Sequence, residues 1–137
     1  MATTRETARA AEPGAADYLS AKLDYEIAPS DLKALLDRDQ NAVFLLDIRA
    51  PGAYADGHVP GARNVPLERL GASYGELPRR TLIVTYCEDL TCGLSLLAAM
   101  ELAGTGFKVK RLLGGMEGWR RKGYPVEPMP PAPAPEY

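Results

Sequence analysis

The chain has 137 residues, of which 46% are hydrophobic and 25% are charged, and its formal net charge at pH 7 is -2. This length suits one domain with a single core, and the composition is that of an ordinary globular protein. No apolar run approaches the roughly 20 residues that cross a bilayer, so we expect no membrane partner. No large basic cluster provides the footprint of a nucleic-acid binder, so we expect no nucleic-acid partner either.

The two ends of the chain differ in composition from the middle. Residues 1–14 are small, polar and rich in alanine, and residues 127–137 are rich in proline, so we expect both segments to be disordered. The N-terminal segment lacks the apolar core of a secretory signal, and its acids argue against a transit peptide, which favours a cytoplasmic location. Residues 15–126 are therefore the predicted folded domain.

Helical and strand patterns alternate along that domain. The runs Ala42–Leu46 and Leu82–Val84 are apolar without alternation, which indicates strands that are buried on both faces of a parallel sheet. We therefore expect an α/β fold of three layers, with its active groups beyond the carboxyl ends of the strands. In chain order the patterns predict a helix over 16–22, a strand over 25–27, a helix over 31–36 capped by Ser30, strands over 42–46, 62–65 and 82–84, a helix over 93–103, a strand over 108–112 and a helix over 116–122.

The two cysteines lie where a predicted strand turns into a predicted helix. Cys87 follows the strand, and the helix begins about five to seven residues later. In this arrangement the loop N–H groups and the helix N-terminus can point at one spot that favours a negative charge, such as a thiolate. Such surroundings lower a cysteine pKa from near 8.5 into the range of roughly 3.5 to 7.5. The alternative is an inert cysteine buried at a strand end.

Cys92 is the sixth residue of this loop. If the loop is tight, the two Cα atoms can approach within the roughly 4.4 to 6.8 Å that a disulfide needs, and Cys92 would then resolve a sulfenic acid or a persulfide on Cys87. The alternative is a small apolar residue in the first turn of the helix. Ser95 is interpreted as a helix residue, because Leu97 stands where a nucleophile elbow needs glycine.

Few residues of the chain are suited to hold a metal. Two cysteines and one histidine supply too few soft ligands for a structural zinc site, so we expect no metal and no cofactor. The cationic run Arg120-Arg121-Lys122 is interpreted as the solvated last turn of a helix, where the helix dipole favours positive charge.

Three stretches resemble the motifs of rhodanese-like domains. They are "LLDIRAPGAYADGHVPGARNVPL", "VTYC" and "LLGGMEGW", which occur in the family's order across roughly residues 25–126. The resemblance implies a five-stranded parallel sheet flanked by helices. It also implies a sulfurtransferase, whose cysteine takes sulfane sulfur from a small donor or a protein persulfide, holds it as a persulfide and passes it to a thiol or another nucleophilic acceptor, which can be a protein.

The resemblance assigns roles to single residues. Cys87 matches the persulfide-forming cysteine. Asp47 and Arg49 match a pair at a strand end, which we expect to be a structural ion pair below the loop rather than a direct contact to substrate. His58 matches a histidine between glycines, where a hydrogen-bonding residue that fixes the loop is expected rather than a general base. Two further matches are structural: Trp119 in the core, and Gly114 with Gly115 for a close backbone approach near the loop.

The loop departs from the family pattern in its charge. Many active members carry an arginine directly after the cysteine and another at the loop's end, whereas the only charged residues of this loop are the acids Glu88 and Asp89. If these acids turn inward, they cancel the attraction for an anion and thiosulfate is a poor donor; if they face solvent, the amides still serve a neutral or protein-borne persulfide. A non-catalytic binding or regulatory module and a thiol redox protein remain as alternatives. The loop comprises Cys87, Glu88, Asp89, Leu90, Thr91, Cys92 and Gly93.

Overall fold

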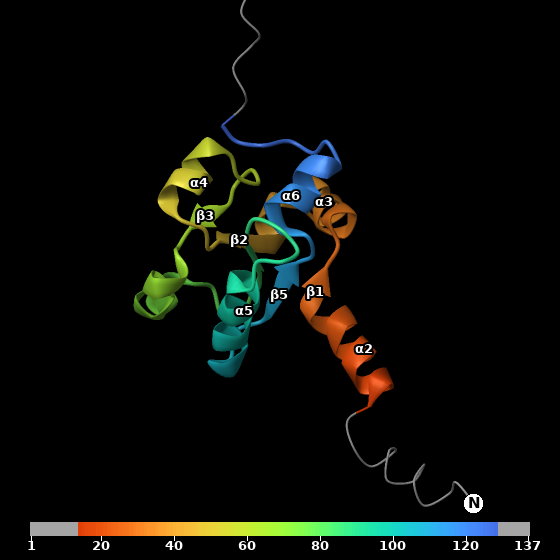
Figure 1. Cartoon of the computed structure of the whole chain (residues 1–137). Helices are drawn as coiled ribbons and strands as arrows, with labels where there is room; N and C mark the ends of the chain where they lie inside the picture. The colour runs from red at the N-terminus through yellow and green to blue at the C-terminus, as the bar shows by residue number, and fades with distance from the viewer. Residues whose placement is uncertain (1–13, 129–137) are drawn as a thin grey trace, which may run out of the picture.

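The computed structural model describes residues 14–128, so most of both predicted disordered segments, 1–13 and 129–137, lies outside the described residues. The domain contains a five-stranded sheet in the order β1-β5-β4-β2-β3, with every pair of neighbouring strands parallel (Figure 1). The predicted three-layer α/β fold is confirmed. The strands are β1 (Glu26–Ile27), β2 (Val43–Asp47), β3 (Arg63–Asn64), β4 (Leu82–Tyr86) and β5 (Val109–Leu112).

The helices agree with the prediction in part. Pro29 takes the first position of α3 and Ala28 is its N-cap, so the prediction of Ser30 as the cap is wrong; the fixed φ of proline suits that first position. The α4 helix and both 3-10 helices were not predicted. The helices are α2 (Ala15–Tyr25), α3 (Pro29–Arg38), α4 (Pro51–Asp56), α5 (Leu94–Gly104) and α6 (Gly115–Arg121), with 3-10 helices η1 (Gln40–Ala42) and η2 (Leu67–Glu76).

The core consists of two hydrophobic clusters, one on each face of the sheet. Along β4, Ile83 packs in the cluster that contains α5 and η2 residues, whereas Val84 and Tyr86 pack in the cluster that contains α3 and α6 residues. Successive side chains of a strand point to opposite faces, so a strand covered on both sides must be apolar throughout. Cys87 belongs to the α5 cluster, which places its side chain on that face.

The described chain ends against the α4 region. Glu127 and His58 form an antiparallel bridge with backbone N···O distances of 2.7 and 2.9 Å. Glu127 was assigned to the extended tail, but unlike its proline neighbours it carries an N–H and can donate this bond. Trp119 is buried, as predicted, and its indole N–H donates to Pro125 O. In the part from 14 to 128, no helix has the length and apolarity to cross a membrane.

Candidate functional site

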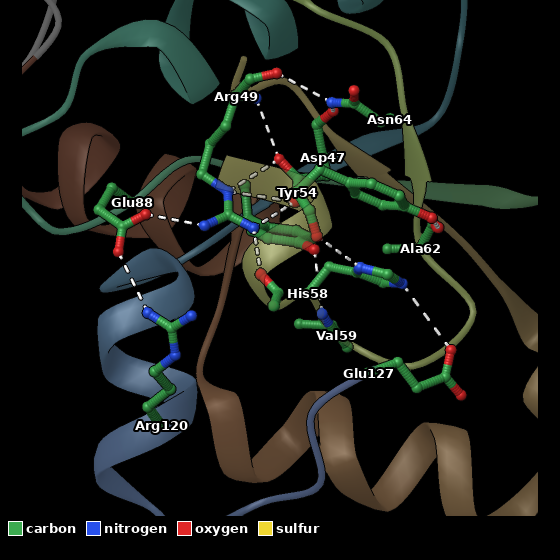
Figure 2. Close-up of polar contacts among 12 residues, drawn as sticks. Asp47, Arg49, Tyr54, His58, Val59, Ala62, Asn64, Glu88, Arg120 and Glu127 are labelled. Atoms are coloured by element: carbon green, nitrogen blue, oxygen red, sulfur yellow. Dashed lines mark hydrogen bonds and ion pairs between the residues drawn. The ribbon is translucent and has the colours of Figure 1, made fainter. Parts of the chain in front are cut away.

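The register between β2 and β4 brings the site together. Asp47 lies beside Tyr86 in this ladder, and both residues end their strands. Because the carboxyl ends of parallel strands meet at one edge, residues just beyond these ends become neighbours. Arg49 Nη1 accordingly lies 2.8 Å from Glu88 Oε2, as Figure 2 shows.

Asp47 and Arg49 form the buried ion pair that the motif predicted. The Arg49 Nη2 atom lies 2.7 Å from Asp47 Oδ2, and Nε lies 3.0 Å from Asp47 Oδ1. Nη2 also donates to Gly57 O at 2.6 Å, and this bond fixes the start of the Gly57–His58 turn. Burial lowers the pKa of Arg49, but the hydrogen bonds to Asp47 and Glu88 outweigh this effect and raise it above its ordinary value. Arg49 is therefore a permanent cation.

His58 contacts α4 and the end of the described chain. Its Nδ1 atom lies 2.8 Å from Tyr54 O, and its ring stacks on the Tyr54 ring with centroids 3.7 Å apart. Nε2 lies 3.8 Å from Glu127 Oε2 (Figure 2). Both ring nitrogens thus face partners that hold two segments of the chain together, and its loop-fixing role stays a prediction.

The first half of the loop is bonded to the start of α6. Cys87 O accepts from Met116 N at 2.9 Å, and Glu88 O accepts from Glu117 N at 2.7 Å. Gly115 has a φ of 58°, and a Cβ there would lie 2.5 Å from Cys87 O, which confirms the predicted close approach. At Gly114 the close neighbour is Gly118 of α6 instead of the loop.

The second half of the loop is held by its own side chains. Asp89 Oδ1 accepts from Thr91 N at 2.9 Å, from Thr91 Oγ1 at 2.7 Å and from Cys92 N at 3.1 Å. These bonds lower the pKa of Asp89, and the bond from the Thr91 hydroxyl has the largest effect. An aspartate readily accepts from the backbone two residues on. The prediction that all loop amides converge on the Cys87 sulfur is therefore wrong for Thr91 and Cys92.

The two cysteines are joined by a disulfide. The Cα atoms of Cys87 and Cys92 lie 6.2 Å apart, which is within the distance range that a disulfide needs. The alternative that Cys92 lies in the first helical turn is wrong, since α5 begins at Leu94 with Gly93 as its N-cap. In this oxidised form Cys87 is 3% exposed. Ser95 lies in α5, as predicted, and its side chain is buried.

Glu88 lies between two arginines. Besides its contact with Arg49, its Oε1 atom lies 3.4 Å from Nη1 of Arg120, which α6 contributes (Figure 2). The sequence interpretation left Arg120 in a solvated helix end and missed this contact. The remaining loop residue, Leu90, is 64% exposed at the tip. Residues 14–128 contain no group of three or more His, Cys, Asp or Glu side chains that could hold a metal ion.

The family model that describes the rhodanese-like domain matches residues 28–122. The chain belongs to the rhodanese-like family. The match contains both halves of the site, from Asp47 to Cys92 and the α6 helix.

Relatives of this rhodanese-like chain include proteins named as sulfurtransferases. It is 32% identical over 88 residues to a sulfurtransferase of Allochromatium vinosum, with 64% of this chain and 81% of the relative covered. It is 36% identical over 98 residues to a thiosulfate sulfurtransferase of Pseudomonas putida, with 69% and 84% covered. A transcriptional regulator of Mycobacterium tuberculosis is 35% identical over 116 residues; the match covers 82% of this chain and 51% of the regulator, so the chain spans about half of that protein.

Solved structures show the same fold. A Bacillus halodurans protein superimposes with a TM-score of 0.75 at 31% identity, covering 82% of this chain and 83% of the other. A thiosulfate sulfurtransferase of Pseudomonas aeruginosa gives a TM-score of 0.68 at 27% identity, covering 79% of this chain and 21% of that longer one. The relatives' names suggest sulfurtransferase chemistry for the family to which this chain belongs.

Proposed function

We propose that this rhodanese-like domain is a sulfurtransferase in which Cys87 carries sulfane sulfur as a persulfide. The supporting observation is the position of Cys87, directly after β4 at the carboxyl edge of the sheet, with its carbonyl bonded to α6. In the transfer step the Cys87 thiolate attacks the sulfane sulfur of a persulfide R–S–SH. The S–S bond of the donor breaks, R–S⁻ leaves, and Cys87–S–SH forms.

The disulfide must be opened before this step. A dithiol reductant exchanges with the Cys87–Cys92 bond, yields two protein thiols and becomes a disulfide itself. While Cys87 is bonded to Cys92, its sulfur is not a thiolate and cannot attack a donor, so reduction must come first. Activity should therefore need a reducing pretreatment.

Cys92 is proposed to resolve the persulfide when no acceptor arrives. Its thiolate attacks the Cys87 sulfur of Cys87–S–SH, the Cys87–Cys92 disulfide forms, and HS⁻ leaves. The observed bond between these residues supports the step, because it shows that the loop brings both sulfur atoms into bonding contact. An external thiol or a protein thiol that attacks the outer sulfur of the persulfide is the competing acceptor.

The test is sulfur uptake measured by intact mass. The reduced protein is freed of reductant and incubated with an organic persulfide, and a gain of one sulfur atom on Cys87 is expected. Cys87→Ser should gain none. Cys92→Ser should keep the added sulfur for longer and release less sulfide, because the resolving thiol is missing. A reduced protein that gains no sulfur from any donor would contradict the proposal.

The disulfide also favours a second candidate, a thiol redox protein. Such a protein would cycle between dithiol and disulfide without taking up sulfur. Equilibration in dithiothreitol buffers, followed by alkylation, measures this exchange. A reversible transition in a protein that gains no sulfur would support the redox candidate. A protein whose binding to its partners is indifferent to Cys87→Ser would instead be a binding module.

A further inference from the structure

Glu88 directly follows the proposed sulfur carrier and is held between two cations. Its two carboxylate oxygens take separate partners, Arg49 from the edge of β2 and Arg120 from α6. Arg49 is buried and already saturated by Asp47 and Gly57 O on its other nitrogens. Arg120 is 43% exposed and Glu88 is 47% exposed, so both can meet an incoming molecule.

The charges around Cys87 leave no surplus cation for a donor. The contacts described above connect the loop with Asp47, Arg49 and Arg120, and with its own acids Glu88 and Asp89 these five charges sum to -1. Replacing Glu88 by a neutral residue brings the sum to zero and leaves Arg120 without this partner. Glu88 therefore lowers the net charge of this group of side chains by one unit.

Four main-chain donors near the cysteine are already bonded within the protein. The amides of Met116 and Glu117 at the start of α6 donate to carbonyls of Cys87 and Glu88. The amides of Thr91 and Cys92 donate to the Asp89 carboxylate. A doubly charged donor such as thiosulfate needs such donors or a free arginine to offset its desolvation, and these four amides are already committed.

We propose that Glu88 is a specificity-determining residue that disfavours dianionic sulfur donors and leaves the site to organic persulfides with at most one negative charge. This inference rests on the proposed sulfurtransferase function. Its physical basis is that Glu88 offsets the charge of Arg120, an exposed cation in contact with the loop, so that Arg120 attracts the oxygens of thiosulfate less.

The test compares two donors on reduced full-length protein. Thiosulfate is assayed with cyanide as acceptor, and 2-hydroxyethyl persulfide, a small alkyl persulfide, is assayed in parallel. Glu88→Gln keeps an acceptor oxygen for Arg49 but removes the charge. It should raise kcat/KM for thiosulfate at least about tenfold and change that for the alkyl persulfide by less than about threefold; the exposure of Glu88 limits the gain through solvent screening. Glu68→Gln, which removes an exposed acid on η2, is the matched control.

Two further variants show whether Arg120 is responsible. Arg120→Gln should lower thiosulfate use, and Glu88→Gln combined with Arg120→Gln should lose most of the tenfold gain. The inference is overturned if Glu88→Gln leaves thiosulfate use at the level of Glu68→Gln, or if it raises the use of both donors equally. Failure of every variant to transfer sulfur from either donor, with no sulfur on Cys87 by intact mass, would instead overturn the proposed function.

Discussion

The two halves of the Cys87–Gly93 loop are held by different kinds of contact. Cys87 and Glu88 are tied to other elements, through the α6 amides and Arg49. Asp89 to Cys92 are tied to each other through the Asp89 carboxylate, and to Cys87 through the disulfide. The fold thus fixes the proposed carrier, whereas Cys92 is positioned by bonds that reduction or acid can break.

The largest expected effect comes from the buried ion pair under the first half. Asp47→Ala leaves Arg49 charged and buried, so the free energy of unfolding should fall by about 3–5 kcal/mol. Asp37→Ala removes the carboxylate of an exposed pair with Lys33 and should cost about 0–1 kcal/mol. Urea unfolding of the oxidised proteins measures both. An equal loss in the free energy of unfolding for both variants would show that Asp47 stabilises the fold no more than an exposed carboxylate does.

The backbone contact between α6 and Cys87 gives the next effect. Gly115→Ala adds a Cβ against Cys87 O at a positive φ, and this should cost about 2–4 kcal/mol by steric strain. Gly52→Ala is the control, because nothing lies within 4 Å of its Cβ position. Urea unfolding measures the difference, and a tolerated Gly115→Ala would mean that the first half is not fixed by α6.

Tyr86, the residue before Cys87, should make stability depend on alkaline pH. Burial raises the pKa of its phenol, and its oxygen accepts from Val59 N. The native state therefore keeps the proton after the unfolded chain loses it near pH 10. The contribution of Tyr86 to the free energy of unfolding is full below pH 10 and declines by about 1.4 kcal/mol per pH unit above it.

The variant Tyr86→Phe isolates this contribution. It should cost about 1–3 kcal/mol at pH 7, since Val59 N loses its acceptor, and should show a shallower decline above pH 10. Tyr25→Phe removes an exposed phenol and is the control. Unfolding at several pH values tests the comparison, and parallel curves for wild type and Tyr86→Phe would contradict it.

The smallest effect is expected in the second half. Asp89→Ala frees the Thr91 and Cys92 amides, which are exposed or half-buried and can bond to water, so it should cost less than Asp47→Ala, Gly115→Ala or Tyr86→Phe. Because the pKa of Asp89 is lowered, its contribution is present above about pH 4 and is lost as the pH falls through the lowered value. Unfolding of both proteins at pH 7 and pH 2 should show a difference that disappears in acid, while Asp56→Ala shows none.

The sequence predicted the parts of the site that depend on local pattern. The apolar run of β4 placed Cys87 at the end of a strand, and the motif placed Asp47 and Arg49 at the end of another strand, β2. The disulfide-compatible distance followed from the spacing of Cys87 and Cys92. These features depend on strand length and on a short loop, which neighbouring residues determine.

The other features of the fold and of the site could not be predicted, because the local sequence does not determine them. Arg120 reaches Glu88 only because α6 packs beside the loop, and no spacing in the chain reports that packing. The inward turn of Asp89 competes with an equally allowed turn to solvent, so the sequence left both open. The α4 helix was missed because its proline and glycine favour a turn, although proline suits the first helical position that Pro51 occupies.

The bridge between His58 and Glu127 determines where the described chain leaves the domain. A Cβ on Gly57 would lie 2.8 Å from Arg120 Nη2 and 3.1 Å from Val126 Cγ1, so the exit point adjoins the arginine that contacts the loop. A peptide or protein attached directly after Pro128 would therefore start near Arg120, the arginine that contacts Glu88 of the loop. A short flexible tether gives effective concentrations in the millimolar range, so a partner joined directly after Pro128 would meet Arg120 and Glu88 at high local concentration.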